Sequence, residues 1–266
     1  MRNASCMLLV LIVAGCSNGV TPDGRHQLQS GYQAIGQNDY NGAMKSADQF
    51  LHDHPHGGGG TAEALYLEGR VFEQRATTEE GAGREGEAKL DLQTARSTYV
   101  RALALPAEPK LVALIHSGVA NTAYFQEDYA TAMNEWAVAY PQMIQLDVRA
   151  WMLYRIGVCQ QRLARFDQAD RSFAEVRQLF PNSVPAQRAV AHQGAKAFYV
   201  QVGAFADQAT ADKIVASLQS QGYRAARMSP QPARQEVVVV PAYTYADAKQ
   251  LRSRLLASYP GAVIAP

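Results

Sequence analysis

Three histidines and an aspartate lie close together in the string LHDHPHGGGG at residues 51–60. Imidazole and carboxylate groups, the ligands that zinc takes in proteins, come from His52, Asp53, His54 and His56. Their alternating spacing fits neither an i, i+4 pair on a helix nor a two-plus-two zinc pattern. The proline and the glycines that follow favour a helix end and a flexible loop. We therefore expect no metal site here, and any binding of nickel or copper would be adventitious.

Two pairs of adjacent acids are the next side chains that could do chemistry, Glu79-Glu80 and Glu127-Asp128. A glycosidase, for example, needs two carboxyl groups positioned in a cleft, whereas both pairs lie in polar segments typical of solvated loops. The sequence also contains no Gly-x-Ser-x-Gly elbow, no phosphate-binding loop and no His-Glu-x-x-His helix. We therefore expect no catalytic residue, no cofactor and no enzyme activity.

The N-terminal residues predict export and acylation. Arg2 precedes the apolar run MLLVLIVA at residues 7–14, which is too short to cross a bilayer and is typical of a signal peptide. The tetrapeptide VAGC at residues 13–16 resembles the lipobox of bacterial lipoproteins. The resemblance implies that a signal peptidase removes residues 1–15 and that Cys16 becomes the lipidated N-terminus. An ordinary cleaved signal with an incidental cysteine is the alternative.

The residues after the lipobox indicate where the lipid anchor would lie. Acyl chains on Cys16 would make a durable membrane anchor, since each buried CH₂ contributes roughly 0.8 kcal/mol. Ser17 occupies the position at which Asp favours the inner membrane in well-studied Gram-negative bacteria, so we expect the periplasmic face of the outer membrane. Residues 16–25 would form a lipidated tether. Cys159 would then have no intrachain cysteine partner, and we expect it to be a buried small residue of a helix.

Charge and composition divide the exported chain into two parts. Residues 196–266 carry eight Lys or Arg and four Asp or Glu, a net charge of +4, whereas residues 17–195 carry sixteen and twenty, a net charge of −4. Neither value favours nucleic acid as a partner, and the compartment argues against it. The positive C-terminal part could help the chain sit on an anionic polymer. An apolar content of 47% is sufficient for two hydrophobic cores.

A repeated spacing of small residues and proline predicts stacked helical hairpins in the first part. Steps of twelve residues separate Gly31, Ala43 and Pro55 and, later, Gly157, Ala169 and Pro181. Small residues at this separation, one on each helix of a hairpin, let the two helices approach closely, and the proline ends the second helix. Such a hairpin buries its apolar face only by stacking on a neighbour.

Residues 150–183 resemble a tetratricopeptide repeat. The signature positions of that family are occupied by Leu153, Ile156, Gly157, Ala169, Phe173, Val176 and Pro181. Weaker units are expected at residues 26–56 and 111–141. A further pair of helices is expected at residues 62–76 and 94–106, with the polar stretch from Thr77 to Lys89 intervening between them.

Together, residues 26–195 are therefore expected to form a short right-handed tetratricopeptide-like α-solenoid. A helix at residues 185–196 would cap it and would hold the C-terminal part semi-rigidly against the last repeat. By analogy with the family, the concave groove of the solenoid would bind a protein or peptide partner.

Beyond residue 196 the pattern changes to short alternating runs. Strand signals lie at residues 198–203, 223–228, 235–240 and 262–265, and helical patterns lie at residues 207–221 and 245–258. The order β-α-β-β-α-β predicts a small four-stranded antiparallel sheet with both helices on one face. The other face of the sheet would be open.

The string FYVQVGAFADQATADKIVASLQSQGYRA closely resembles the first half of a SPOR (sporulation-related repeat) domain. Tyr199 to Phe205 and Gly222-Tyr223 match the motifs of that half. The string VPAY at residues 240–243 stands where the family commonly has Val-Gly-Pro-Phe, although Pro241 replaces the usual glycine. The resemblance covers residues 196–266. It implies binding to peptidoglycan glycan strands without stem peptides, a material that accumulates where cells divide.

The alternation of side chains along a strand predicts which residues would contact such a ligand. Phe198, Val200 and Val202 of the first strand, with Val238 and Val240 of the third, would face the helices. A tyrosine ring can stack on the C–H face of a sugar, and a glutamine amide can bond its hydroxyl and acetamido groups. The expected glycan contacts are Tyr199, Gln201, Phe205, Val237, Val239, Arg224, Arg227 and Arg234. Two alternatives stay open: Tyr199 could cap the sheet edge, and the turn could place Phe205 in the core.

The sequence thus predicts a non-enzymatic, lipid-anchored envelope protein that binds peptidoglycan and offers helical repeats to a protein partner, with a role in cell division. The alternative hypothesis is a scaffold lipoprotein of outer-membrane or secretion assemblies whose SPOR-like part binds protein. The valines expected on the open face, at Val237 and Val239, favour this alternative because other members of the family present polar or basic groups there.

Overall fold

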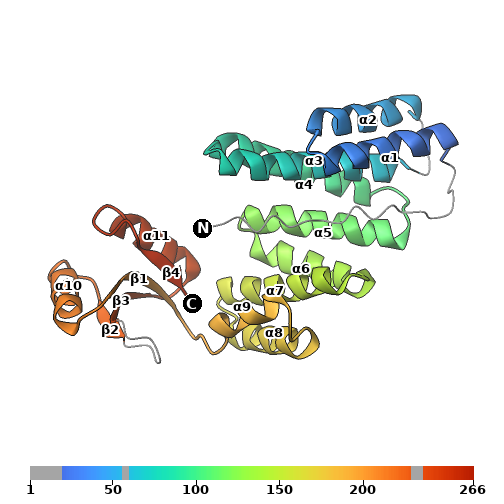
Figure 1. Ribbon diagram of the computed structural model, residues 1–266. Coiled ribbons are helices and arrows are strands. Elements are labelled where there is room, and N and C mark those ends of the chain that lie inside the picture. Colours follow the sequence, from blue (N-terminus) through green and yellow to red (C-terminus); the bar gives the residue numbers. More distant parts are fainter. Residues whose placement is uncertain (1–19, 56–59, 229–235) are drawn as a thin grey trace. The chain divides into compact units, whose positions relative to one another are not determined.

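The computed structural model describes residues 20–55, 60–228 and 236–266 (Figure 1). The predicted signal peptide at residues 1–15 and the predicted lipidation site Cys16 lie outside the described residues, as do His56 and Arg234. The chain divides into two compact units, Met1–Gln145 and Leu146–Pro266. Among the described helices, none combines the length and apolar character that crossing a bilayer requires.

The first unit consists of helices that pack in consecutive pairs. The elements are α1 (Pro22–Gly36), α2 (Tyr40–Asp53), α3 (Thr61–Gly81), α4 (Glu85–Leu103), α5 (Pro109–Phe125), α6 (Tyr129–Ala139) and the short 3₁₀ helix η1 (Tyr140–Gln142). The helix pairs α1–α2, α3–α4 and α5–α6 correspond to the three weaker repeats expected from the sequence. Figure 1 shows them as successive hairpins of the helical part of the chain.

Two expectations about this unit need correction. We assigned residues 16–25 to a tether, but α1 begins at Pro22, because Thr21 caps it by accepting a hydrogen bond from the backbone N–H of Gly24 at 3.1 Å. We also expected the stretch from Thr77 to Lys89 to separate two helices. Instead α3 and α4 take up all but three of these residues, since the pair between Arg75 of α3 and Asp91 of α4 joins the two helices along this segment.

The ring of Tyr99 shows why small residues recur in the helix pairs. Tyr99 lies in α4 and is completely buried. A Cβ atom on Gly69 of α3 would lie 2.5 Å from the ring, and one on Gly118 of α5 would lie 2.6 Å from it. Both glycines therefore provide space that a larger residue would close, and the ring links three helices.

The second unit begins with a helical hairpin and a third helix. These are α7 (Leu146–Arg162), α8 (Phe166–Leu179) and α9 (Val184–His192). A Cβ atom on Gly157 of α7 would lie 2.7 Å from the ring of Phe173 in α8, so Gly157 has the role expected of the repeat. We predicted that the capping helix would reach Lys196. It ends earlier, at His192, because Gln193 is extended and Gly194 has a φ of +83°.

The rest of the second unit is a small sheet covered by two helices (Figure 1). Its elements are β1 (Phe198–Phe205), α10 (Gln208–Ser220), β2 (Ala226–Met228), β3 (Glu236–Ala242), α11 (Tyr245–Leu255) and β4 (Val263–Ala265). The strand order is β2-β3-β1-β4 and every pairing is antiparallel. The core cluster contains residues of both helices, such as Leu218 of α10 and Leu255 of α11. The predicted β-α-β-β-α-β fold is confirmed.

Polar bonds hold the segment between α9 and β1 against α8. The Nζ atom of Lys196 lies 2.9 Å from Asp167 and 3.0 Å from Asp170. Asp170 also accepts a hydrogen bond of 2.7 Å from the backbone N–H of Gly194. The predicted domain boundary between residues 195 and 196 falls inside the second compact unit and stays a prediction.

Aromatic contacts join the same hairpin to the sheet. The rings of Phe166 in α8 and Phe198 in β1 have their centroids 5.5 Å apart. The guanidinium group of Arg162 lies over the ring of Tyr245 in α11, 4.8 Å from its centroid. A semi-rigid attachment of the sheet to the last repeat requires contacts of this kind.

Candidate binding face of the C-terminal sheet

The helix-covered face of the sheet is apolar and closed. Phe198, Val200 and Val202 of β1 are 4% exposed or less and share one core cluster with Val238 and Val240 of β3. The inward alternation predicted for both strands is therefore what the structure has. The side chains between these residues belong to the opposite face.

An irregularity in β1 changes the alternation near its end. Gln201 pairs with Val239, but Gly203 pairs with Val238, so Val202 is an extra residue and forms a β-bulge. After the bulge, Phe205 returns to the helix side and packs against the core cluster. Of the two positions that we left open for Phe205, the structure has the core position. Phe205 therefore does not join Tyr199 and Gln201.

Tyr199 and Gln201 lie next to each other on the open face, and both side chains are partly exposed. Tyr199 pairs with Pro241 of β3 and Ala265 of β4, which places it between two strands rather than at an edge. Gln201 likewise lies between Val239 and Val263. The structure thus places an aromatic ring and an amide side by side on the open face of β1, a strand that lies between two others.

The predicted valines differ in how much surface they offer. Val237 is partly exposed, whereas Val239 is only 6% exposed although it lies outside the helix-side core cluster. Its pairing partners Gln201 on β1 and Ala226 on β2 flank it on both sides. Val239 therefore lies on the open face but offers little exposed surface to a ligand.

Further apolar side chains on this face were not predicted from the sequence. Met228 pairs with Val237 and is 47% exposed, and Val263 pairs with Gln201 and is 45% exposed. Both sit on edge strands of three residues. Such short strands show no alternation in the sequence, so only the register with β1 and β3 reveals which face their side chains occupy.

The three predicted arginines have different surroundings. Arg227 pairs through Nε with Asp212 of α10 at 3.0 Å and through Nη1 with Glu236 at 2.8 Å. These bonds hold Arg227 on the helix side, away from the open face, and the Glu236 bond is the main cause that raises its pKa. Arg224 is exposed and donates a hydrogen bond of 2.8 Å to the hydroxyl of Tyr243. Arg234 lies outside the described residues.

The structure describes residues 51–55 of the histidine-rich string, and they lie at the C-terminal end of α2. The His54 ring stacks on Phe50 with centroids 4.3 Å apart, and its Nδ1 atom lies 2.8 Å from the Phe50 carbonyl oxygen. Asp53 accepts a hydrogen bond from Gln27 of α1 at 2.8 Å. Over the described ranges, we find no group of three or more His, Cys, Asp or Glu side chains that could hold a metal ion.

Cys159 is fully buried in α7. Burial raises the pKa of its thiol to about 12, so the side chain stays protonated and has little nucleophilic character. This is the buried small residue that the sequence predicts.

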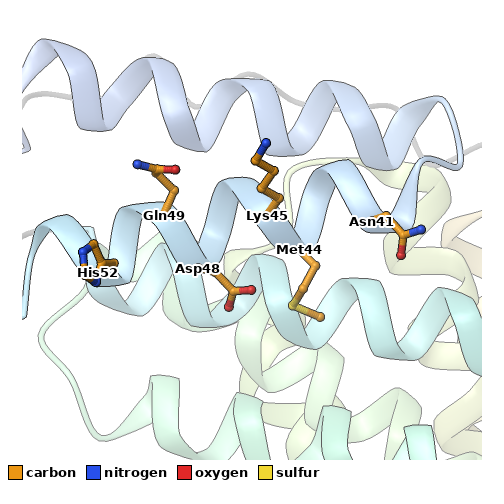
Figure 2. Close-up of a pocket in the computed structure, with 6 residues that line it drawn as sticks. All are labelled: Asn41, Met44, Lys45, Asp48, Gln49 and His52. Atoms are coloured by element: carbon orange, nitrogen blue, oxygen red, sulfur yellow. The ribbon is translucent and has the colours of Figure 1, made fainter.

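The first unit has a hollow on the surface of α2, with a volume of about 410 Å³ (Figure 2). It is lined by Asn41, Met44, Lys45, Asp48, Gln49 and His52. All six residues come from one helix, so the hollow is an open depression and not a cleft between elements. Asp48 lies beside Glu68 of α3, and burial together with the charge of Asp48 raises the pKa of Glu68 to about 7. None of the residues predicted to contact the glycan lines this hollow.

Comparison with known protein families finds one match in the helical part of the chain and one in the C-terminal part. Residues 194–266 match the SPOR domain, and residues 152–183 match a tetratricopeptide repeat. Both predictions are confirmed over these ranges. SPOR domains belong to a peptidoglycan-binding family, tetratricopeptide repeats mediate protein interactions, and both are non-catalytic binding domains. No curated protein matches the sequence.

Solved structures also resemble the chain. One is described as the crystal structure of MamA protein. It has 14% sequence identity and a TM-score of 0.44, and the match covers 78% of this chain and 98% of the MamA chain.

Proposed function

We propose that this chain, which carries a SPOR domain at residues 194–266, is a non-enzymatic envelope protein that binds glycan strands of peptidoglycan lacking stem peptides. The ligand would lie on the open face of the sheet. The observation that carries the proposal is the position of Tyr199 and Gln201, partly exposed and adjacent at the interior of that face. Sugar rings present C–H groups on their faces and polar groups at their rims, which an aromatic ring next to an amide can match.

The remaining parts of the proposal concern where the protein acts. Cys16 would carry the lipid that anchors the chain to the outer membrane, facing the periplasm. The helical repeats would recruit a protein partner, and the SPOR domain would bring the assembly to strands that are exposed during cell division. The tetratricopeptide match at residues 152–183 supports the scaffold role, and the lipobox-like sequence at residues 13–16 supports the anchor.

A second function is favoured by the apolar character of the open face. Val237, Met228 and Val263 present hydrocarbon surface on both sides of Gln201. Exposed apolar surface of this kind also suits a protein segment. On this alternative, the chain is a scaffold of outer-membrane or secretion assemblies and its SPOR domain binds protein.

Co-sedimentation with peptidoglycan sacculi tests the two functions. The full chain carrying Cys16→Ser, which prevents acylation, would be mixed with sacculi before and after an amidase removes the stem peptides. We expect binding to increase after amidase treatment. Gln201→Ala should weaken binding about five- to tenfold, because the amide loses its hydrogen bonds to the sugar.

Gln250→Ala is the matched control, since Gln250 is an exposed glutamine of α11 on the helix side. This variant should bind as the parent chain does. A well-folded chain that binds neither preparation of sacculi would contradict the glycan proposal and would favour the protein-binding scaffold.

A further inference from the structure

A tyrosine and an arginine form an exposed pair at one end of the sheet. The Tyr243 side chain is 79% exposed, which is unusual for an aromatic ring of a folded domain. Arg224 Nη1 donates a hydrogen bond of 2.8 Å to the Tyr243 hydroxyl. The bond joins the segment before β2 to the segment after β3, so two chain positions far apart in sequence orient each other's side chains.

Both side chains belong to the open face. Ala225 and Ala242, the neighbours of Arg224 and Tyr243, are buried in the helix-side core cluster. Arg224 and Tyr243 are exposed and lie one residue from these buried alanines, just outside β2 and β3, so continuing the alternation of the two strands directs them to the opposite side. Tyr199 pairs with Pro241, two residues before Tyr243. Tyr243 directly follows the end of β3, so its backbone position lies roughly 7–8 Å from that of Tyr199, the usual spacing of diagonal neighbours.

The charge of Arg224 is available to a ligand. Among the described residues, the bonded partner of its guanidinium group is the hydroxyl of Tyr243, and no carboxylate lies within ion-pair distance. Arg227, by contrast, is held by Asp212 and Glu236. A guanidinium group next to an aromatic ring suits a sugar that carries a carboxylate, because it can donate two parallel hydrogen bonds to the anion.

Peptidoglycan strands without stem peptides carry such carboxylates. In the complete polymer, the lactyl group of each muramic acid is joined to its peptide by an amide and is neutral at that position. Hydrolysis of the amide adds water across the C–N bond, which leaves a carboxylate on the sugar and an amine on the released peptide. Removal of the peptide therefore adds one negative charge per muramic acid to the strand.

We infer that Arg224 and Tyr243 form a subsite that recognises this lactyl carboxylate, so that the protein distinguishes strands without stem peptides by their charge. The inference rests on the proposed function and concerns the same face of the sheet. Tyr243 would support the sugar ring, and Arg224 would pair with the carboxylate beside it. The subsite compensates for the valines that β3 presents at Val237 and Val239.

The test compares two forms of the same ligand. Glycan strands released from stem peptides by an amidase would be used directly, or after their carboxylates are converted to methylamides with carbodiimide and methylamine. We expect the Cys16→Ser full chain to bind the methylamide strands about fivefold more weakly, which is the scale of one exposed charge pair. Arg224→Gln should bind both forms equally, at the weaker affinity.

Three further variants separate charge from ring contact. Arg254→Gln removes an equivalent positive charge from the exposed side of α11 and should behave as the parent chain. Tyr243→Ala should weaken binding to both forms of the strand, whereas Tyr243→Phe should retain the ring contact and lose part of the preference for the carboxylate. Circular dichroism would establish that each variant is folded.

The outcomes separate the subsite from the proposed function. If the parent chain binds both forms equally well, or if Arg224→Gln keeps the preference for the carboxylate, the subsite is overturned while glycan binding stands. If the folded parent chain binds neither form, the proposed function fails, and the subsite with it.

Discussion

Glu68 illustrates how one side chain can make the stability of the repeats depend on pH. It lies in α3 beside Asp48, and burial, followed by the negative charge of Asp48, raises its pKa to about 7. The folded chain therefore retains this proton at pH values where the unfolded chain, with a pKa near the ordinary value of about 4.5, has released it. The Glu68 contribution to the free energy of unfolding falls as the pH rises from about 4.5 to about 7.

Glu68→Gln should remove this dependence. We expect the variant to be more stable than the parent chain at pH 8, where Glu68 is charged, and to match it near pH 5, where Glu68 is protonated. Urea unfolding followed by far-UV circular dichroism at both pH values measures the difference. Glu175→Gln, at an exposed position of α8, is the control. A constant difference between Glu68→Gln and the parent chain across this pH range would contradict the prediction.

At the scale of elements, close approach of helices depends on glycine. Gly157 of α7 faces the ring of Phe173 in α8, and a Cβ atom there would lie 2.7 Å from the ring. Phe173 is completely buried, so the ring has little room to move. The same arrangement recurs where Tyr99 packs against Gly69 and Gly118.

Gly157→Val should therefore destabilise the last hairpin by about 1–3 kcal/mol, the usual cost of overpacking a filled core. The midpoint of urea unfolding would report the loss. Gly86→Ala in α4 is the control, because a Cβ atom on Gly86 has nothing within 4 Å. That substitution should be neutral or slightly stabilising, since alanine is the better helix former. Equal stability of Gly157→Val and the parent chain would show that the ring moves aside.

At the scale of the second unit, the contacts between the last repeat and the sheet decide how freely the binding face can reorient. Phe166 of α8 packs against Phe198, and Phe198 in turn packs against Tyr245 of α11, with both ring pairs 5.5 Å apart. The bonds from Lys196 to Asp167 and Asp170 shorten the free segment between the two parts. A partner bound to the last repeat would then have a restricted orientation relative to any ligand on the open face of the sheet.

Phe166→Ala should loosen this attachment. Spin labels at Glu175→Cys in α8 and Ser253→Cys in α11, both exposed positions, would report the distance between the hairpin and the sheet. We expect a narrow distribution of distances in the parent chain and a broad one after Phe166→Ala. Leu179→Ala, at a half-exposed residue of α8, should leave the distribution unchanged. A broad distribution in the parent chain itself would refute a semi-rigid attachment.

The sequence by itself determined most of the helices, the order of strands and helices along the C-terminal part of the chain, and the inward side chains of β1 and β3. These features follow from local periodicity, since each residue of a helix or strand takes its direction from the backbone next to it. The motifs around Gly157 and Tyr199 were sufficient to identify both families. The position of Gln201 on the open face followed from the same alternation.

Only the tertiary structure decided how the side chains of different strands combine on the face. The bulge at Val202 turns Phe205 to the core, the ion pairs with Asp212 and Glu236 hold Arg227 on the helix side, and the bond between Arg224 and Tyr243 creates an exposed pair. Each depends on the register between strands or on a helix packed against them. Register is set by contacts between residues distant in sequence, so a local pattern cannot specify it.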